Sequence, residues 1–128
     1  MISFDYDSDY DPPFPVATIA INLPENSGAG ITHPALIDTG ADSTMIPVNL
    51  LDQLGASAVG NARMRGVLGD SELVDIYLIR VQIGSYIAHA IRAVAMPVGS
   101  ELILGRNVLN NFIITLNGLA HVTEFRDE

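Results

Sequence analysis

The 128-residue sequence contains no cysteine and no lysine, and each absence excludes a class of protein. Without cysteine there is no disulfide framework, no thiolate metal site and no cysteine nucleophile. Without lysine a P-loop nucleotide site is excluded, because its lysine binds the phosphates. Uninterrupted apolar runs are only a few residues long, so no segment is predicted to span a membrane. A chain of this length supplies the core of one domain, which excludes a two-lobed enzyme.

Positive charge is also scarce. Fifteen acidic residues face six basic ones, all of them arginine, and the formal net charge is −9. Binding to nucleic acid and docking on anionic lipid both need a basic face, so we expect neither nucleic acid nor membrane as a partner. Residues 1–5 are acidic where a secretory signal would be basic and then apolar. We therefore expect a cytoplasmic protein.

The start of the chain differs in composition from the rest. Residues 5–15 hold four of the fifteen acids and three of the seven prolines, which excludes a helix or a central strand there. We expect residues 1–15 to form an acidic, proline-rich N-terminal arm and residues 16–128 to form a single domain.

The pattern after residue 15 predicts mostly strands, because alternating or short apolar segments are separated by turn residues. The segment 72–83 has apolar residues on both faces, which predicts that both sides of that strand are covered. A helix is predicted over residues 47–54, with proline at its start and Gly55 just beyond its end, and a helical turn over 105–110. A polar turn is predicted over residues 25–30, and Asn117-Gly118 predicts a tight hairpin. The predicted strands are residues 16–23, 35–37, 44–46, 63–68, 72–83, 86–96, 102–104, 113–116 and 119–125.

Two segments share a local pattern. Residues 36–40 and residues 102–105 each form an apolar strand that ends at a glycine, and a short helical pattern follows each of them. The pair predicts an all-β half-barrel with approximate internal two-fold symmetry and one or two short helices.

The tetrapeptide Asp38-Thr39-Gly40-Ala41 has the sharpest chemical interpretation. An apolar strand delivers Asp38 to a tight turn, where threonine bonds neighbouring backbone and glycine permits close approach. Two carboxylates about 3 Å apart share one proton, so one activates water while the other protonates the developing oxyanion. The sequence holds a single Asp-Thr-Gly, so such a pair requires a second chain. The alternative is an ordinary turn in which Asp38 caps its own backbone.

Two segments, in order, resemble the retropepsin-like aspartic protease family. The first is residues 35–44, Ala-Leu-Ile-Asp-Thr-Gly-Ala-Asp-Ser-Thr, and the second is residues 103–109, Ile-Leu-Gly-Arg-Asn-Val-Leu. The stretch between Asp38 and Gly105 leaves room for the flap hairpin that this family has there. The two segments together are far more specific than either alone. The resemblance implies a retropepsin-like fold that functions as a homodimer.

The resemblance also implies roles for five residues. Asp38 matches the catalytic aspartate, and Thr39 matches the residue that locks the two active-site loops of the dimer together. Gly40 and Asp42 match positions that contact the substrate backbone. Arg106 matches a structural support that pairs with the acid at Asp42, and a guanidinium binds a carboxylate bidentately. The alternative for Arg106 is a solvated residue at a helix start.

The flap tip is implied at Gly66-Val67-Leu68-Gly69, where it would contact the substrate. An ordinary hairpin turn explains the two glycines equally well. Ala41 follows the triplet where bilobal pepsin-like relatives have Ser or Thr. Loss of that hydroxyl leaves the ionised carboxylate less stabilised, so we expect activity at mildly acidic pH.

The three histidines lie on separate predicted strands without metal-ligand spacing, so we expect no metal ion and no cofactor. The implied function is an aspartic endopeptidase that hydrolyses peptide or protein substrates as a homodimer. The alternative is a non-catalytic dimerisation or peptide-binding module on the same fold, because a fold does not by itself determine function.

Overall fold

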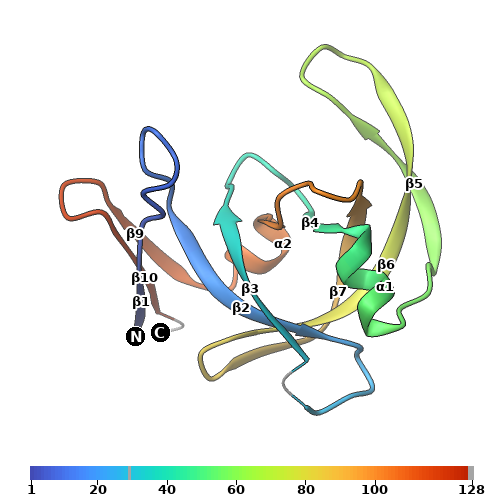
Figure 1. Ribbon diagram of the computed structural model, residues 1–128, viewed down its shortest axis with the longest axis horizontal. Coiled ribbons are helices and arrows are strands. Elements are labelled where there is room, and N and C mark those ends of the chain that lie inside the picture. Colours follow the sequence, from blue (N-terminus) through green and yellow to red (C-terminus); the bar gives the residue numbers. More distant parts are fainter. Residues whose placement is uncertain (29, 127–128) are drawn as a thin grey trace.

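The computed structural model describes residues 1–28 and 30–126, which form ten strands and two short helices (Figure 1). The prediction of an all-β chain with one or two short helices is confirmed. The polar turn predicted over residues 25–30 includes Ala29, which lies outside the described residues. The elements are β1 (Ile2–Asp5), β2 (Val16–Asn22), β3 (Ile31–Ile37), β4 (Thr44–Pro47), α1 (Val48–Leu54), β5 (Gly60–Arg65), β6 (Ser71–Ile83), β7 (Tyr86–Met96), β8 (Ile103–Leu104), α2 (Arg106–Leu109), β9 (Ile113–Asn117) and β10 (Val122–Arg126).

The larger of the two sheets closes on itself. Its strand order is β2-β3-β8-β4-β7-β6-β5, and β2 pairs with β6 as well. The second pairing joins six strands into a ring and leaves β5 outside it. Strands β3 and β8 run parallel, with Ile37 opposite Leu104, so the residues that follow them lie side by side. The two segments that share a local pattern are therefore neighbours in the fold.

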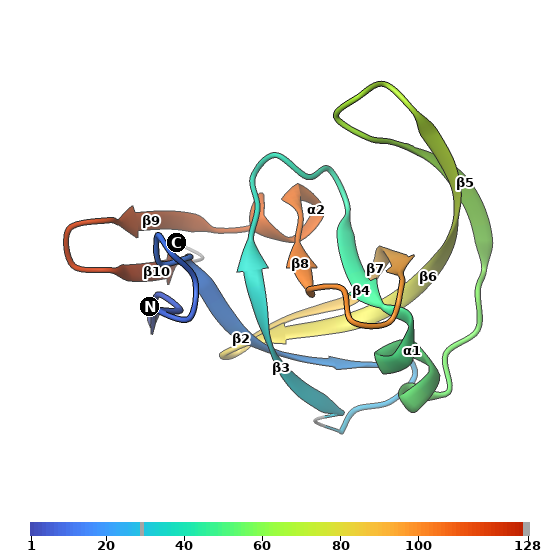
Figure 2. The same ribbon diagram turned by 45° about the horizontal axis from the view of Figure 1, so that its top comes forward.

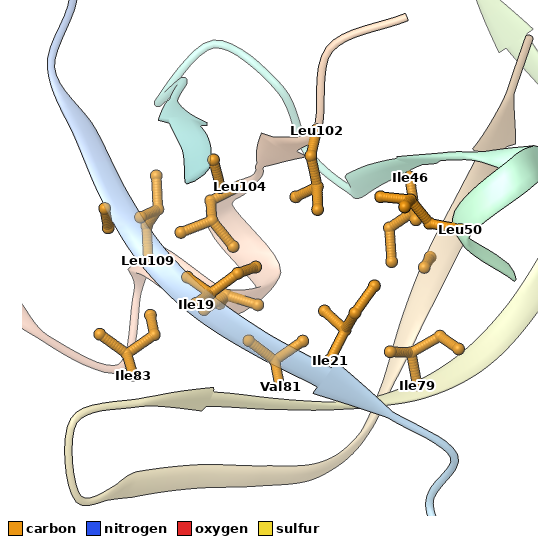
Figure 3. Packing of buried hydrophobic residues seen from close by; sticks show 14 of the residues in the cluster. Ile19, Ile21, Ile46, Leu50, Ile79, Val81, Ile83, Leu102, Leu104 and Leu109 are labelled. Atoms are coloured by element: carbon orange, nitrogen blue, oxygen red, sulfur yellow. The ribbon is translucent and has the colours of Figure 1, made fainter. Parts of the chain in front are cut away.

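The core fills the inside of this ring (Figure 3). Alternation along β2 turns Ala17, Ile19 and Ile21 inward, each at most 1% exposed, while Thr18 faces solvent. Burial of one such isoleucine side chain stabilises the fold by about 1.5–3 kcal/mol. Figure 3 also labels Ile46, Leu50, Ile79, Val81, Ile83, Leu102, Leu104 and Leu109.

Residues 60–75 form a hairpin, here called the flap hairpin, that projects from the body of the molecule (Figures 1 and 2). Residues 71–76 of β6 pair with β5, and residues 76–83 pair with β7. Leu73 is 63% exposed and Leu78 is 40% exposed. The prediction that both faces of this strand are covered is therefore wrong at these two residues. Leu73 lies where the strand leaves the body of the sheet, and Leu78 is exposed within the part that pairs with β7.

The acidic N-terminal segment is tied to the body at both ends. β1 pairs antiparallel with β10 in the three-stranded sheet β1-β10-β9. Phe4 packs edge-on against buried Phe125, with ring centroids 5.9 Å apart. At the other end, the Ile37 N–H donates to the Pro15 carbonyl at 3.0 Å. The segment is predicted as an extended arm, but it folds back on itself, because Asp7 and Phe14 exchange two backbone hydrogen bonds, and its first strand belongs to the small sheet.

Tyr10 fastens the middle of the same segment to the loop before β8. Its hydroxyl donates to Oε1 of Glu101 at 2.6 Å, and its ring lies 5.4 Å from that of Phe14. The hydrogen bond to Glu101, together with burial and the negative charge of that carboxylate, raises the pKa of Tyr10 to about 12. The segment is therefore held along its length.

The β9–β10 hairpin forms where Asn117-Gly118 predicts one, but its loop is longer than two residues. Asn117 pairs with Val122, so residues 118–121 make the connection. Oδ1 of Asn117 accepts from the Ala120 N–H at 3.0 Å, and His121 has a positive φ of 55°. The ring of Tyr6 stacks on the ring of His121, and the backbone N–H of Tyr6 donates to the His121 carbonyl at 2.8 Å. The two-residue turn is therefore wrong, since contacts with the N-terminal segment hold a wider loop.

Helix α1 begins one residue later than predicted. Pro47 is its cap, with φ −55° and ψ 134°, and Gly55 ends it in the left-handed region at φ 74°, which favours glycine. Leu50 and Leu51 of this helix are buried in the core. Within residues 1–28 and 30–126, no helix combines the length and the apolar character that crossing a bilayer demands.

Candidate active site

Asp38 lies immediately after β3, where that strand leaves the core. Leu36 and Ile37 are 7% and 5% exposed, and Asp38 is half-buried. The Asp38 N–H donates to the Leu104 carbonyl at 3.2 Å, which extends the parallel β3–β8 pairing by one step. The buried strand pair thus fixes the position of a carboxylate at its end.

The residues after Asp38 form a tight turn around its carboxylate. Oδ1 of Asp38 accepts from the Gly40 N–H at 2.9 Å, and the Asp38 carbonyl accepts from the Ala41 N–H at 3.2 Å. A Cβ at position 40 would lie 3.1 Å from Oδ1, so glycine leaves the space that this turn needs. Both the capped turn and the catalytic loop considered from the sequence have this geometry. Thr39 and Asp42 are exposed on the loop, and Ala41 is buried beneath it.

The second matched segment braces this loop from β8 and α2. The Arg106 N–H donates to the Ala41 carbonyl, and Nη1 of Arg106 donates to the Thr39 carbonyl, both at 2.8 Å. A Cβ at position 105 would lie 2.4 Å from the Ser43 carbonyl group, so the close approach requires glycine. In the described part of the chain, Arg106 forms no ion pair with Asp42. The predicted pairing is therefore wrong, because the guanidinium bonds to loop backbone instead.

A buried polar network lies below the loop. Thr44 is fully buried, and its N–H and hydroxyl donate to Oδ1 of Asn107 at 3.0 and 2.9 Å. The Thr44 hydroxyl accepts from the Gly105 N–H at 3.2 Å. Nδ2 of Asn107 donates to the Arg92 carbonyl on β7 at 2.7 Å. Hydrogen bonds of this kind hold the loop, β7, β8 and α2 in one arrangement.

A groove with a cavity volume of about 980 Å³ lies between the Asp38 loop and the flap hairpin. Asp38, Gly40, Ala41 and Asp42 form one side of it. The apolar residues of its other walls are Met45, Ala62, Met64, Val67, Val74, Ile76, Ala90, Ile91 and Val94. An apolar cleft with a carboxylate at one side is suited to an extended chain with apolar side chains.

Only part of the predicted flap tip, Gly66 to Gly69, lines the groove. Gly66 and Val67 line the groove, whereas Leu68 and Gly69 are not among the lining residues that the structure describes. Val67 and Leu68 are both more than 90% exposed. Gly69 has a φ of 84°, and a Cβ at Gly66 would lie 2.7 Å from Oδ1 of Asp70, so both glycines fit this tight tip.

Sequence reasoning assigned no role to Thr44, Asn107 or Arg92. Thr44 and Asn107 lie inside the two matched segments, so a polar residue in otherwise apolar stretches was the available signal. Arg92 carries no local signal, because its place beside the groove depends on the pairing of β6 with β7.

The family model described as gag-polyprotein putative aspartyl protease matches residues 27–111. No curated protein matches the chain. Among solved structures, a retropepsin-like aspartic protease from Rickettsia conorii is similar over 97% of this chain and 88% of its own, with a TM-score of 0.70 and 13% identity. EIAV protease, solved in complex with the inhibitor HBY-793, is similar over 76% of this chain and 86% of its own, with a TM-score of 0.60 and 19% identity.

The family match and the fold agree on the same residues. Residues 27–111 contain both Asp38-Thr39-Gly40 and Gly105-Arg106, the two segments that the parallel β3–β8 pair brings together. The solved structures, at their low identities, support the fold. The chain therefore belongs to the gag-polyprotein putative aspartyl protease family and has the retropepsin-like fold.

Proposed function

We propose that the protein is an aspartic endopeptidase that acts as a homodimer, with Asp38 from each of two copies forming one catalytic pair. The observation that carries the proposal is the placement of Asp38. Its carboxylate is on a tight loop, braced from β8 and α2, at one side of a groove of about 980 Å³. One chain supplies one such aspartate, so a second copy completes the site.

The chemistry follows from two carboxylates held close together. About 3 Å apart, they share one proton, because both cannot ionise at once. The ionised carboxylate takes a proton from a water molecule as the water oxygen attacks the peptide carbonyl carbon. The neutral carboxyl group gives its proton to the carbonyl oxygen. The carboxyl group that took the proton from water then gives it to the amide nitrogen, while the other carboxylate takes a proton from a hydroxyl of the tetrahedral intermediate. The C–N bond breaks and releases an amine and a carboxylic acid.

The substrate is an extended peptide that lies along the groove under the flap hairpin. Backbone hydrogen bonds supply affinity in this mode of binding, and side-chain pockets supply selection. The apolar walls, with Met64, Ile76 and Val94 among them, favour apolar side chains. We expect Val67 and Leu68, which are exposed at the tip of the flap hairpin, to cover a bound chain.

Cleavage of a diverse peptide pool tests the proposal. Wild-type protein and Asp38→Asn are incubated with the pool from about pH 3 to about pH 8, and products are identified by mass spectrometry. Asp52→Asn is the matched control, because Asp52 is exposed on α1 and does not line the groove that the structure describes. We expect products from wild type and Asp52→Asn, and none from Asp38→Asn.

Light scattering on the same samples reports the oligomeric state, and the proposal requires a dimer under cleaving conditions. An absence of products that depend on Asp38 contradicts the proposal. Peptide binding by a dimer without cleavage would instead support a non-catalytic module on the same fold.

A further inference from the structure

The groove differs in charge from the rest of the chain. In the whole sequence, acidic residues outnumber arginines by fifteen to six. Among the groove-lining residues that the structure describes, arginines outnumber acids by four to two. The charged lining residues are Arg63, Arg65, Arg92, Arg106, Asp38 and Asp42. A cleft whose charge is opposite in sign to that of the whole protein concentrates ligands of the complementary sign, here negative ones.

Arg92 lies on the face of β7 that lines the groove. Its neighbour Ala93 is fully buried in the core, so alternation along the strand turns Arg92 away from the core. Ala90 and Val94, two residues away on either side, line the groove as well. The residue opposite Arg92 on β6 is apolar Leu78. The guanidinium group thus extends from an apolar wall.

The backbone of Arg92 is fixed relative to Asp38. The Arg92 carbonyl accepts from Nδ2 of Asn107 at 2.7 Å. The same Asn107 side chain accepts from the N–H and hydroxyl of Thr44, at the end of the Asp38 loop. The Arg92 backbone is therefore joined through Asn107 and Thr44 to the loop that carries Asp38, and both residues line the same groove.

Arg92 is also the lining arginine best placed to receive a ligand. Arg106 donates to the Thr39 carbonyl at 2.8 Å and braces the loop. Arg63 and Arg65 line the groove from the flap hairpin, which projects from the body, whereas Arg92 lies on β7 within the body of the sheet. Across residues 1–28 and 30–126, the Arg92 guanidinium makes no hydrogen bond and no ion pair, whereas the Arg92 carbonyl accepts from Asn107.

We infer that Arg92 makes the groove select peptides that carry an acidic side chain close to the scissile bond, flanked by apolar ones. The inference rests on the proposed function and names its substrate class. A guanidinium binds a carboxylate bidentately, which a glutamine amide does not reproduce. An extended peptide turns alternate side chains to opposite sides, so one acidic position meets Arg92 while its neighbours meet the apolar walls.

The experiment compares cleavage of a peptide pool whose positions sample Glu, Gln, Lys and apolar residues. Wild type, Arg92→Glu, Arg92→Gln and Arg126→Glu are assayed, and Asp38→Asn gives the background. Arg126 is the matched control, because it is exposed at the end of β10, on the side of the molecule away from the flap hairpin (Figure 1). In wild type we expect Glu at one position to be cleaved about tenfold faster than Gln, with the ratio falling as salt is added.

Each variant has a distinct expected result. Arg92→Glu moves the preference at that position to Lys, Arg92→Gln removes it without reversal, and Arg126→Glu retains the wild-type preference. Equal cleavage of Glu and Gln peptides by wild type, or a wild-type preference in Arg92→Glu, overturns the inference and leaves the proposed function standing. If no product depends on Asp38, the proposed function fails and the inference fails with it. Circular dichroism of both Arg92 variants confirms that a lost preference does not come from unfolding.

Discussion

Replacement of Gly105 by alanine tests whether direct backbone contact holds the Asp38 loop. A Cβ at position 105 would lie 2.4 Å from the carbonyl carbon and oxygen of Ser43 and 2.9 Å from the Thr44 nitrogen. These are backbone atoms, so they cannot rotate aside as the end of a side chain would. The φ of Gly105 is −93°, which alanine adopts freely, so the substitution tests the contact alone.

The loss of stability that Gly105→Ala causes can be worked out from the contacts that must move. Forcing an extra carbon into a closely packed position costs about 1–3 kcal/mol. Two hydrogen bonds cross the same point, from the Gly105 N–H to the Thr44 hydroxyl and from the Arg106 N–H to the Ala41 carbonyl. Each contributes about 1 kcal/mol. We expect Gly105→Ala to lower the free energy of unfolding by about 2–4 kcal/mol.

Urea unfolding at equal protein concentration measures this change, with Gly118→Ala as the matched control. A Cβ at Gly118 meets no described atom within 4 Å, and its φ is not positive. We expect that variant to stay within about 0.5 kcal/mol of wild type. If Gly105→Ala is as stable as Gly118→Ala, β8 does not brace the loop in the way described.

Three further predictions concern the network below the loop, the N-terminal segment and the reaction. Thr44→Val should lower the free energy of unfolding by about 1–3 kcal/mol, because it removes the acceptor of the buried Gly105 N–H and one of the two donors to Oδ1 of Asn107, whereas exposed Thr115→Val should change it by less than about 0.5 kcal/mol in the same urea assay. The raised pKa of Tyr10, about 12, stabilises the folded state below about pH 10, and this contribution is lost as the pH rises through about 12. Ultraviolet titration should place one tyrosine there, and Glu101→Gln should lower its pKa; an unchanged pKa would show that the hydrogen bond is not its cause. Activity should peak at mildly acidic pH, because the active-site loop has alanine where pepsin-like enzymes have a hydroxyl, and a pH–rate optimum near 2 would refute this.

The local parts of the site could be predicted from the sequence. Asp38-Thr39-Gly40 follows one apolar strand, and Gly105-Arg106 follows another. The residue types alone therefore predicted where each strand ends and which residues form the turn after it. Gly55 marked the end of α1 for the same reason, since a left-handed backbone favours glycine.

Features that depend on distant pairing could not be predicted. The guanidinium of Arg106 reaches the Thr39 carbonyl because β8 lies parallel to β3, whereas the family resemblance implied a carboxylate partner. The wide loop after Asn117 depends on Tyr6, more than a hundred residues earlier in the chain, which stacks on His121. Leu73 is exposed because the flap hairpin extends beyond the body of the molecule at that residue. In each case a tertiary contact decided between structures that the local sequence permits.

A mixing experiment tests the central claim, that one chain holds half of an active site. Wild-type protein is allowed to exchange subunits with a ninefold excess of Asp38→Asn, and peptide cleavage is compared with that of the same concentration of wild type alone. If the catalytic pair spans two chains, most wild-type chains enter mixed dimers and activity falls to about one tenth. Activity that stays unchanged in the presence of Asp38→Asn would show that each chain acts alone, and would contradict the account.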